Sequence, residues 1–200
     1  MTYFFGSDDS HRTRDLKRHL RRVALARRDA LPAEHRAAAA AAIAAQPLPL
    51  PIEPGNVVCG YAAIRSELDP IPLMRRLVKA GARLALPAVG GRGRPLALRA
   101  WEFGMPLNPG PWGLSEPTPD APAVVPDIVL VPLAAFDRTG HRIGYGAGYY
   151  DLTLAELRAA GPIIAIGLAF AAQEIPKVPA SERDAPLDLV VTEQEVIDLR

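Results

Sequence analysis

Hydrophobic positions recur with a helical period near the start of the chain. Leu16, Leu20 and Val23 follow the i, i+4, i+7 spacing of an amphipathic helix, which we expect over residues 10–30. Pro32 suits the first turn of a second helix, "PAEHRAAAAAAIAAQ". The alternate prolines that follow remove backbone donors and fix φ, so an extended connector is expected after this helix.

Beyond the connector, apolar runs alternate with helical segments. Helices are expected at residues 69–81 and from about residue 148 to residue 161. The stretch 104–126 is rich in proline and lacks a period, so it is expected to be a long ordered loop. This alternation predicts an α/β fold, a single three-layer domain whose mainly parallel sheet has helices on both faces. The expected strands are residues 56–64, 83–89, 96–103, 127–136, 162–170 and 187–193.

The composition limits the range of functions. The chain has 200 residues, 49% of them hydrophobic and 22% charged, as expected for one globular domain over residues 1–200. A net charge of +1 gives no global attraction to nucleic acid or to acidic membranes. No apolar run reaches the roughly 18 residues of a membrane span, and the first residues lack the features of a secretory signal. The one cysteine, Cys59, is expected to be packed and inert, and we expect a cytoplasmic protein with neither nucleic-acid nor membrane partners.

A glycine-rich stretch, "RIGYGAGYYD" at residues 142–151, follows the most apolar predicted strand. Ligands of parallel α/β folds bind at the carboxyl ends of strands. Gly144, Gly146 and Gly148 can adopt positive φ, so successive N–H groups can converge on an anion, aided by a helix that begins near Gly148. The stretch has neither the Lys-Ser/Thr pair of a Walker A motif nor the G-x-G-x-x-G spacing. From spacing alone, a phosphate site and a plain tight connection both remain open.

The three residues after the glycines bear on that choice. Asp151, in the first helical turn, can simply compensate the helix dipole. Beside a polyphosphate it would instead supply the carboxylate that Mg²⁺ requires. Tyr149 and Tyr150 can be core residues, or they can stack on a flat ligand.

The longer stretch "VPLAAFDRTGHRIGYGAGYYD" closely resembles the signature of the 5-formyltetrahydrofolate cyclo-ligase family. Further similar pieces occur in the family's order, and the resemblance spans about residues 14–193. It implies an ATP-dependent ligase that closes 5-formyltetrahydrofolate to 5,10-methenyltetrahydrofolate, with Mg²⁺ as cofactor, ATP as co-substrate, and ADP and phosphate as products. We also expect a monomer or a weak homodimer. The further pieces are "KRHLR", "SELDP", "PWGLSEP", "GLAFAAQ" and "VPASERDAPLD".

The resemblance implies a set of residues for each role. The catalytic residues would be Lys17, Arg21, Arg142 and Tyr149. ATP would contact Lys17, Arg21, Arg142, Ile143, Gly144, Tyr145, Gly146, Ala147, Gly148, Tyr149 and Tyr150. The folate would contact Arg21, Glu67, Trp112, Tyr145, Gly146, Ala147, Gly148 and Tyr149. Mg²⁺ would bind Asp151 and Asp184.

Some of these residues have a plainer interpretation without the resemblance. Lys17 and Arg21 share one helical face, which the neighbouring arginines would otherwise mark as a solvated basic surface. Glu67 would be an ordinary surface carboxylate at a strand end. The chain also departs from the family pattern, with Ala147 where glycine is frequent and Leu152 where arginine is frequent. Because of Leu152, a non-catalytic folate- or nucleotide-binding relative stays an alternative.

Overall fold

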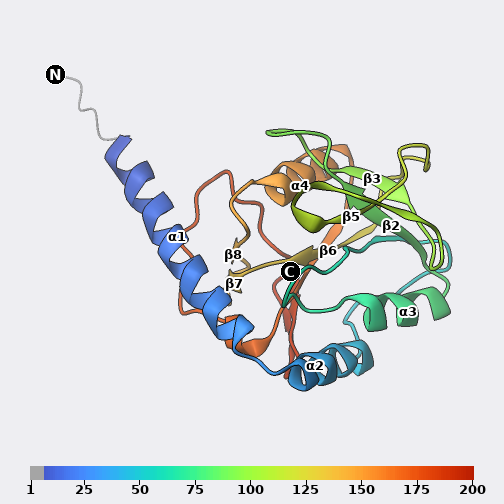
Figure 1. The fold of residues 1–200 in the computed structure, drawn as a ribbon, viewed down its shortest axis with the longest axis horizontal. Helices are drawn as coiled ribbons and strands as arrows, with labels where there is room; N and C mark the ends of the chain where they lie inside the picture. Colours follow the sequence, from blue (N-terminus) through green and yellow to red (C-terminus); the bar gives the residue numbers. More distant parts are fainter. Residues whose placement is uncertain (1–6) are drawn as a thin grey trace.

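A seven-stranded sheet forms the centre of the molecule (Figure 1). The computed structural model describes residues 7–200, with side chains from residue 12 onward. The first six residues, where a secretory signal was not expected, lie outside the described part of the chain. The strands follow the order β11 (Val196–Asp198), β10 (Leu189–Val191), β9 (Ile164–Leu168), β6 (Ile128–Pro132), β1 (Val57–Cys59), β2 (Arg83–Ala88) and β3 (Ala97–Ala100) across the sheet.

The five inner strands, from β10 to β2, run parallel, whereas the edge strands β3 and β11 are antiparallel to their neighbours. In the register, Val58 lies beside Ile128 and Leu130 beside Ile166. These four side chains are almost fully buried, as expected for strands covered on both faces. The prediction of a mainly parallel sheet is confirmed.

Helices cover both faces of the sheet. On one face, α2 (Ala33–Ala45) and α3 (Ile71–Lys79) pack Ile43 and Leu73 against Val58. On the other face, α4 (Tyr149–Ala160) packs Leu154 in a cluster with Cys59. Successive strand side chains point to opposite faces, which is why Val58 and Cys59 join different clusters. The predicted three-layer arrangement is confirmed, as is the burial of the Cys59 thiol, which raises its pKa to about 12.

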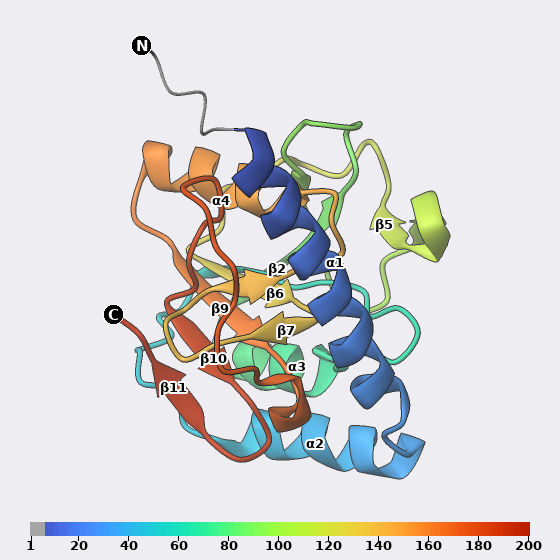
Figure 2. The same cartoon turned by 90° about the vertical axis from the view of Figure 1, so that its left-hand side faces the viewer.

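The first helix, α1 (Ser7–Asp29), lies at the carboxyl end of the parallel strands (Figures 1 and 2). It packs beside a small antiparallel ribbon of β7 (Ala135–Phe136) and β8 (Arg142–Ile143), and beside the short 3-10 helix η2 (Ala171–Gln173). Because β8 leads directly into the glycine-rich loop, this packing brings the basic helix to that loop.

Several predicted elements differ in extent. The strand expected at 56–64 is shorter and ends at Cys59. The chain then passes close to α3, since a Cβ at Gly60 would lie 2.5 Å from Met74 Sδ. The strand expected at 127–136 is divided into β6 and β7. The predicted loop 104–126 is wrong in part, since it contains a hairpin. This hairpin consists of β4 (Leu107–Pro109), the 3-10 turn η1 (Pro111–Gly113) and β5 (Ser115–Pro117).

No helix among residues 7–200 combines the length and the apolar character needed to cross a membrane.

Candidate active site

The glycine-rich loop connects β8 to α4 and is exposed over residues 145–147. Gly146 and Gly148 have φ of +98° and +72°, so both need the left-handed backbone that glycine adopts readily. Ala147 has no positive φ, and alanine therefore fits this loop without backbone strain. A Cβ at Gly144 would meet no atom within 4 Å, so the loop borders open space there.

Gly148 is the N-cap residue of α4, and no side chain caps this end of the helix. The first N–H groups of a helix lack intrahelical partners and carry partial positive charge. Among the described residues, no side chain accepts a hydrogen bond from these N–H groups as a cap, so they are available to bind an anion. The sequence prediction of a helix beginning near Gly148 is confirmed, and the anion site remains a prediction.

Two cations of α1 reach the loop and its surroundings. Lys17 Nζ donates to Asp184 Oδ1 at 2.5 Å, and Arg21 Nε donates to the Gly144 carbonyl at 2.5 Å. The Arg21 guanidinium also lies 3.5 to 3.6 Å from the place of a Cβ at Gly146. Their shared helical face is thus turned toward the loop, whereas the neighbouring Arg18 is exposed. The plainer interpretation of a solvated basic surface does not hold for these two side chains.

The two aspartates predicted to bind metal, Asp151 and Asp184, both lie next to the backbone N–H of Ala185. Asp151 Oδ1 accepts hydrogen bonds from Arg142 Nη2 at 2.7 Å and from the Ala185 N–H at 3.2 Å. Asp184 precedes Ala185 and accepts from Lys17 and from Ser181. Burial alone would raise the pKa of Asp184, but the hydrogen bonds from Lys17 and Ser181 hold it below its ordinary value. The fold thus brings together two carboxylates that are separated by 33 positions in the sequence.

These carboxylates suit Mg²⁺. The ion prefers hard oxygen ligands and takes one or two carboxylates together with phosphate oxygens. Among the described residues, both hydrogen bonds to Asp151 fall on Oδ1, which leaves Oδ2 for a cation. The same residues contain no cluster of three or more His, Cys, Asp or Glu side chains that could hold a metal, so phosphate or water would have to complete the shell.

The Arg142 side chain links the strand before the glycine loop to Asp151 and Ala185. Its side chain is 4% exposed, and its donors are used by Asp151 Oδ1 and by the Ala185 carbonyl. Burial lowers the pKa of the guanidinium, while the nearby Asp151 and Asp184 raise it. The structure therefore connects Arg142 with the predicted metal ligands. Its predicted role in catalysis is not tested by this contact.

Glu67 is buried rather than exposed, so its plainer interpretation as a surface carboxylate is wrong. Its Oε2 accepts from the Ile64 N–H at 2.9 Å, and its side chain interacts with Tyr145. Burial raises the pKa of Glu67, and these contacts and the charge of Arg28 act in the opposite direction. Tyr145 in turn accepts from Arg28 Nη1 at 2.5 Å.

Arg28 was missed by the sequence analysis. It stands 7 positions after Arg21 and 11 after Lys17, so it continues the inward face of α1. That periodicity was the signal that could have indicated it. Its partner Tyr145 lies 117 positions away, which no local pattern reveals.

Trp112 lies at the tip of the β4–β5 hairpin, 66% exposed, and its ring centroid is 6.1 Å from that of Tyr149. The two ring planes are inclined at 50°, so they flank an open angle rather than stack on each other. Trp112 also has a φ of +58°, an unusual conformation for a bulky residue. The structure thus brings Trp112 to the start of α4, as its predicted place in the folate site requires.

Two predicted loop residues point into the protein. The Ile143 side chain is buried in a cluster with Ala24 and Ile175, and its carbonyl accepts from the Ala134 N–H. Tyr150 packs into the cluster beneath α4, where burial raises the pKa of its hydroxyl. Side-chain contacts of these two residues with ATP are therefore not supported.

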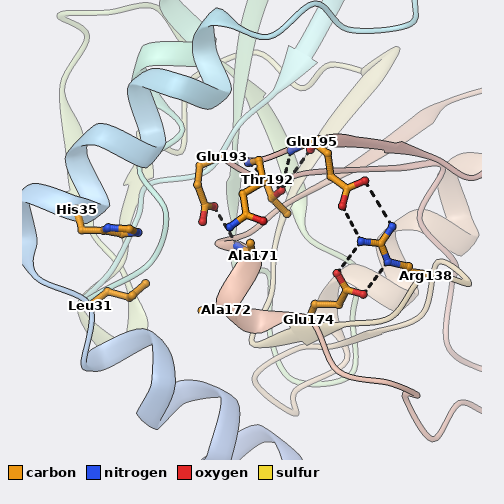
Figure 3. Close-up of a pocket in the computed structure, with 10 residues that line it drawn as sticks. Leu31, His35, Arg138, Ala171, Ala172, Glu174, Thr192, Glu193 and Glu195 are labelled. Atoms are coloured by element: carbon orange, nitrogen blue, oxygen red, sulfur yellow. Dashed lines mark hydrogen bonds and ion pairs between the residues drawn. The ribbon is translucent and has the colours of Figure 1, made fainter.

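A cavity of about 460 Å³ lies elsewhere, between η2 and the junction of α1 with α2 (Figure 3). Arg138 joins Glu174 and Glu195 in its wall, and Glu193 accepts from the Ala171 N–H (Figure 3). None of the predicted site residues lines it. Its charged side chains Arg138, Glu174 and Glu195 are paired with one another, so the candidate active site remains the surface around the glycine loop.

Comparison with known proteins agrees with this geometry. The sequence model of the 5-formyltetrahydrofolate cyclo-ligase family matches residues 13–193. The chain belongs to this family. The extent agrees with the resemblance found along the sequence, and the protein is accordingly an enzyme of the ligase class.

Individual members of the 5-formyltetrahydrofolate cyclo-ligase family are similar over most of the chain. The cyclo-ligase of Mycolicibacterium smegmatis is 36% identical over 150 residues, which are 69% of this chain and 74% of that protein. The Escherichia coli cyclo-ligase is 32% identical over 160 residues, covering 73% and 82%. The solved structure of Aquifex aeolicus 5,10-methenyltetrahydrofolate synthetase has a TM-score of 0.75 and 30% identity, covering 92% of this chain and 93% of that one. The synthetase of Mycoplasma pneumoniae has a TM-score of 0.66 at 21% identity, covering 88% and 98%, and supports the fold.

Proposed function

We propose that the protein closes 5-formyltetrahydrofolate to 5,10-methenyltetrahydrofolate, using ATP and releasing ADP and phosphate. The observation that most supports this proposal is the set of charged and polar groups around the glycine loop. The uncapped start of α4 supplies N–H donors, Arg21 holds the Gly144 carbonyl, and Lys17 lies at the carboxylate of Asp184. Cations, amide donors and carboxylates next to one loop are what a nucleotide triphosphate with its metal requires.

The chemistry explains why ATP is needed. The formyl oxygen on N5 has to leave, and oxide or hydroxide is a poor leaving group. Transfer of the terminal phosphoryl group of ATP to this oxygen produces a good leaving group and an electrophilic carbon. N10 of the same folate attacks that carbon and releases its proton to solvent, and cleavage of the carbon–oxygen bond with loss of phosphate completes the methenyl bridge. Positioning and charge neutralisation are therefore the main tasks of the protein.

In this proposal the cations of α1 serve the nucleotide. Lys17 and Arg21 would neutralise phosphate charge, and Arg21 would also contact the folate. The N–H groups of residues 144–148 would hold phosphate oxygens, since the loop is exposed and a Cβ at Gly144 or Gly148 would meet no atom within 4 Å. Arg142 would act by keeping Asp151 in place, because its guanidinium is bound to that carboxylate.

Asp151 and Asp184 would hold Mg²⁺. The ion would supply positive charge that stabilises the phosphate oxygens of ATP. Lys17 is bound to Asp184 in the structure, so it is already positioned beside the predicted metal ligands. When ATP binds, we expect Lys17 to exchange the carboxylate for a phosphate oxygen.

The folate would lie between Glu67 and the aromatic pair. Glu67 can accept hydrogen bonds from pterin N–H groups, and Tyr145 exposes its ring beside it. Trp112 and Tyr149 would enclose the folate from the other side of the loop. Tyr149 belongs to both sites because it is the first residue of α4.

We further propose that residues 1–200 act as one cytoplasmic domain, as a monomer or a weak homodimer, without nucleic acid or membrane. The net charge of +1 is consistent with this setting. Light scattering at increasing protein concentration would measure the oligomeric state.

The test is a direct assay. The protein is mixed with 5-formyltetrahydrofolate, ATP and Mg²⁺, and the ultraviolet absorbance of the methenyl product is followed. We expect product in the complete mixture and none when ATP or Mg²⁺ is left out. Tight binding of both ligands without turnover would instead identify a non-catalytic relative, the alternative that Leu152 leaves open.

A further inference from the structure

Arg28 carries a buried charge that none of the proposed roles uses. It lies in the last turn of α1, and only 2% of its surface is exposed. Buried charges are costly unless their donors are satisfied. Arg28 Nε donates to Ser66 Oγ at 3.1 Å, and Nη1 donates to Tyr145 Oη at 2.5 Å. The guanidinium therefore connects the segment before Glu67 with the glycine loop.

The guanidinium determines the direction of the next hydrogen bond. A guanidinium has donors only, so the Tyr145 oxygen must accept from Arg28. The single hydroxyl proton of Tyr145 is then left for another acceptor. Burial raises the pKa of this hydroxyl, and Glu67 is the carboxylate whose charge raises it further. Glu67 is itself held by the Ile64 N–H. Arg28, Tyr145 and Glu67 thus follow one another in a series in which hydrogen bonds can run in one direction only.

We propose that Arg28 is a positioning residue for the folate, which acts through the Tyr145 hydroxyl to orient the Glu67 carboxylate toward the pterin N–H groups. This inference rests on the proposed function. Tyr145 can transmit the effect because the residue is 42% exposed while its hydroxyl meets a buried guanidinium. A lysine at position 28 would keep the charge, but it lacks the planar fork that reaches Ser66 and Tyr145 together.

The position of Arg28 along α1 separates its effect from ATP. Lys17 and Arg28 are 11 residues apart on the same helical face, or about 16 Å along the axis. Lys17 contacts Asp184 on the metal side, whereas Arg28 contacts Tyr145 and Ser66 on the folate side. Loss of Arg28 should therefore change folate affinity and leave ATP affinity nearly unchanged.

The experiment is a kinetic comparison in which folate and ATP are varied separately. The variants are Arg28→Met, Arg28→Lys, Tyr145→Phe and the double variant Arg28→Met/Tyr145→Phe. We expect both Arg28 variants to raise the KM for 5-formyltetrahydrofolate about tenfold, the effect of losing a hydrogen bond from a charged group. The KM for ATP should stay within about twofold, and the double variant should be no worse for folate than Tyr145→Phe alone. Arg27→Met, which removes a charge from the exposed side of the same turn, should change neither KM.

Each contrary outcome has a distinct meaning. If the unaltered protein forms no methenyl product, the proposed function is wrong and the role of Arg28 falls with it. If that protein is active, an Arg28→Lys variant with an unchanged folate KM overturns the positioning role alone. Equal increases in the KM values for ATP and folate would also overturn it. The same holds if the effect of Arg28→Met on the folate KM adds in full to the effect of Tyr145→Phe. Should Arg28→Met fail to fold, Arg28→Lys retains the buried charge and permits the same comparison.

Discussion

Lys17 and Asp184, 167 positions apart, form an ion pair with 2.5 Å between Nζ and Oδ1. Both side chains are largely buried, at 17% exposed each. Because solvent screens such a pair little, it is stronger than an exposed ion pair. The contact ties α1 to the segment that carries one predicted metal ligand. A substitution at Lys17 should therefore change the binding of ATP.

Reversing the charge at Lys17 should weaken ATP binding far more than folate binding. In Lys17→Glu, a carboxylate would face Asp184 and repel the phosphates that Lys17 is proposed to neutralise. We expect the KM for ATP to rise about tenfold or more, since a charge-assisted contact is lost. The folate KM should change by less than about twofold. Arg18→Glu is the matched control, because Arg18 is an exposed cation one position further on the helix. A larger effect on folate than on ATP would contradict the assignment of Lys17.

Asp151→Asn should raise the requirement for Mg²⁺. The variant keeps an oxygen that can accept from Arg142 but loses the charge that a divalent ion needs, so we expect the Mg²⁺ concentration for half-maximal turnover to rise about tenfold or more. It also leaves the buried Arg142 without its counter-charge, which should lower the free energy of unfolding by about 1–3 kcal/mol. Turnover is measured against Mg²⁺ concentration, and stability by urea unfolding.

A matched carboxylate separates these two effects. Asp188 pairs with Arg158 at 2.8 Å and accepts from the Ala165 N–H, away from the glycine loop. Asp188→Asn should therefore lower stability to a similar extent and leave the Mg²⁺ requirement unchanged. If both variants alter the requirement equally, Asp151 is not a metal ligand.

Much of this site could be predicted because its signals are local. The glycine spacing predicted left-handed backbone at Gly144, Gly146 and Gly148, and the structure has it at the last two but not at Gly144. The i, i+4 spacing predicted that Lys17 and Arg21 share a face. The chain-distant pairs could not be found in this way. Nothing near Asp184 indicates that its partner is Lys17, and no local pattern around Glu67 indicates that this carboxylate is buried.

The extent of the elements was harder to predict than their order. β1 ends at Cys59, and Gly60 then lies so close to Met74 that there is no room for a side chain, a tertiary contact that no local pattern indicates. The β4–β5 hairpin was missed because its strands contain Pro109 and Pro117, which suggested a loop. Local composition therefore described the fold class better than the boundaries.

The stability of the loop before the glycines should depend on pH through Asp137. This carboxylate is buried and accepts hydrogen bonds from Thr139, His141 and Val178. Burial alone would raise the pKa of Asp137, but these hydrogen bonds outweigh it and lower the pKa below its ordinary value. A folded-state pKa below the unfolded value contributes stability above the unfolded value and loses it as the pH falls through the folded value.

Asp137→Asn should accordingly lower the free energy of unfolding by about 1–3 kcal/mol at neutral pH. The difference from the unaltered protein should shrink below about pH 4, where Asp137 of the unaltered protein also takes up a proton. Urea unfolding at a series of pH values measures it. A difference that stays constant down to pH 2 would show that the charge of Asp137 is not the stabilising feature.

Trp112 should stabilise substrate binding at the cost of fold stability. Its φ of +58° is unfavourable for a residue with a large side chain, whereas asparagine tolerates this region. Trp112 is 66% exposed, so replacing its side chain removes little packing. Trp112→Asn should therefore raise the free energy of unfolding by about 1 kcal/mol while raising the folate KM several-fold, because the wall opposite Tyr149 is lost.

Val125→Asn is the matched control for this prediction. Val125 is an exposed apolar residue of the same proline-rich segment, but its φ is not positive. The substitution should change neither the folate KM nor, by more than about 0.5 kcal/mol, the stability. If Trp112→Asn raises stability and weakens folate binding while Val125→Asn changes neither, the strained backbone is retained for the ligand. A variant that loses stability would instead show that the tryptophan ring holds the hairpin against α4, and an unchanged folate KM would remove Trp112 from the folate site.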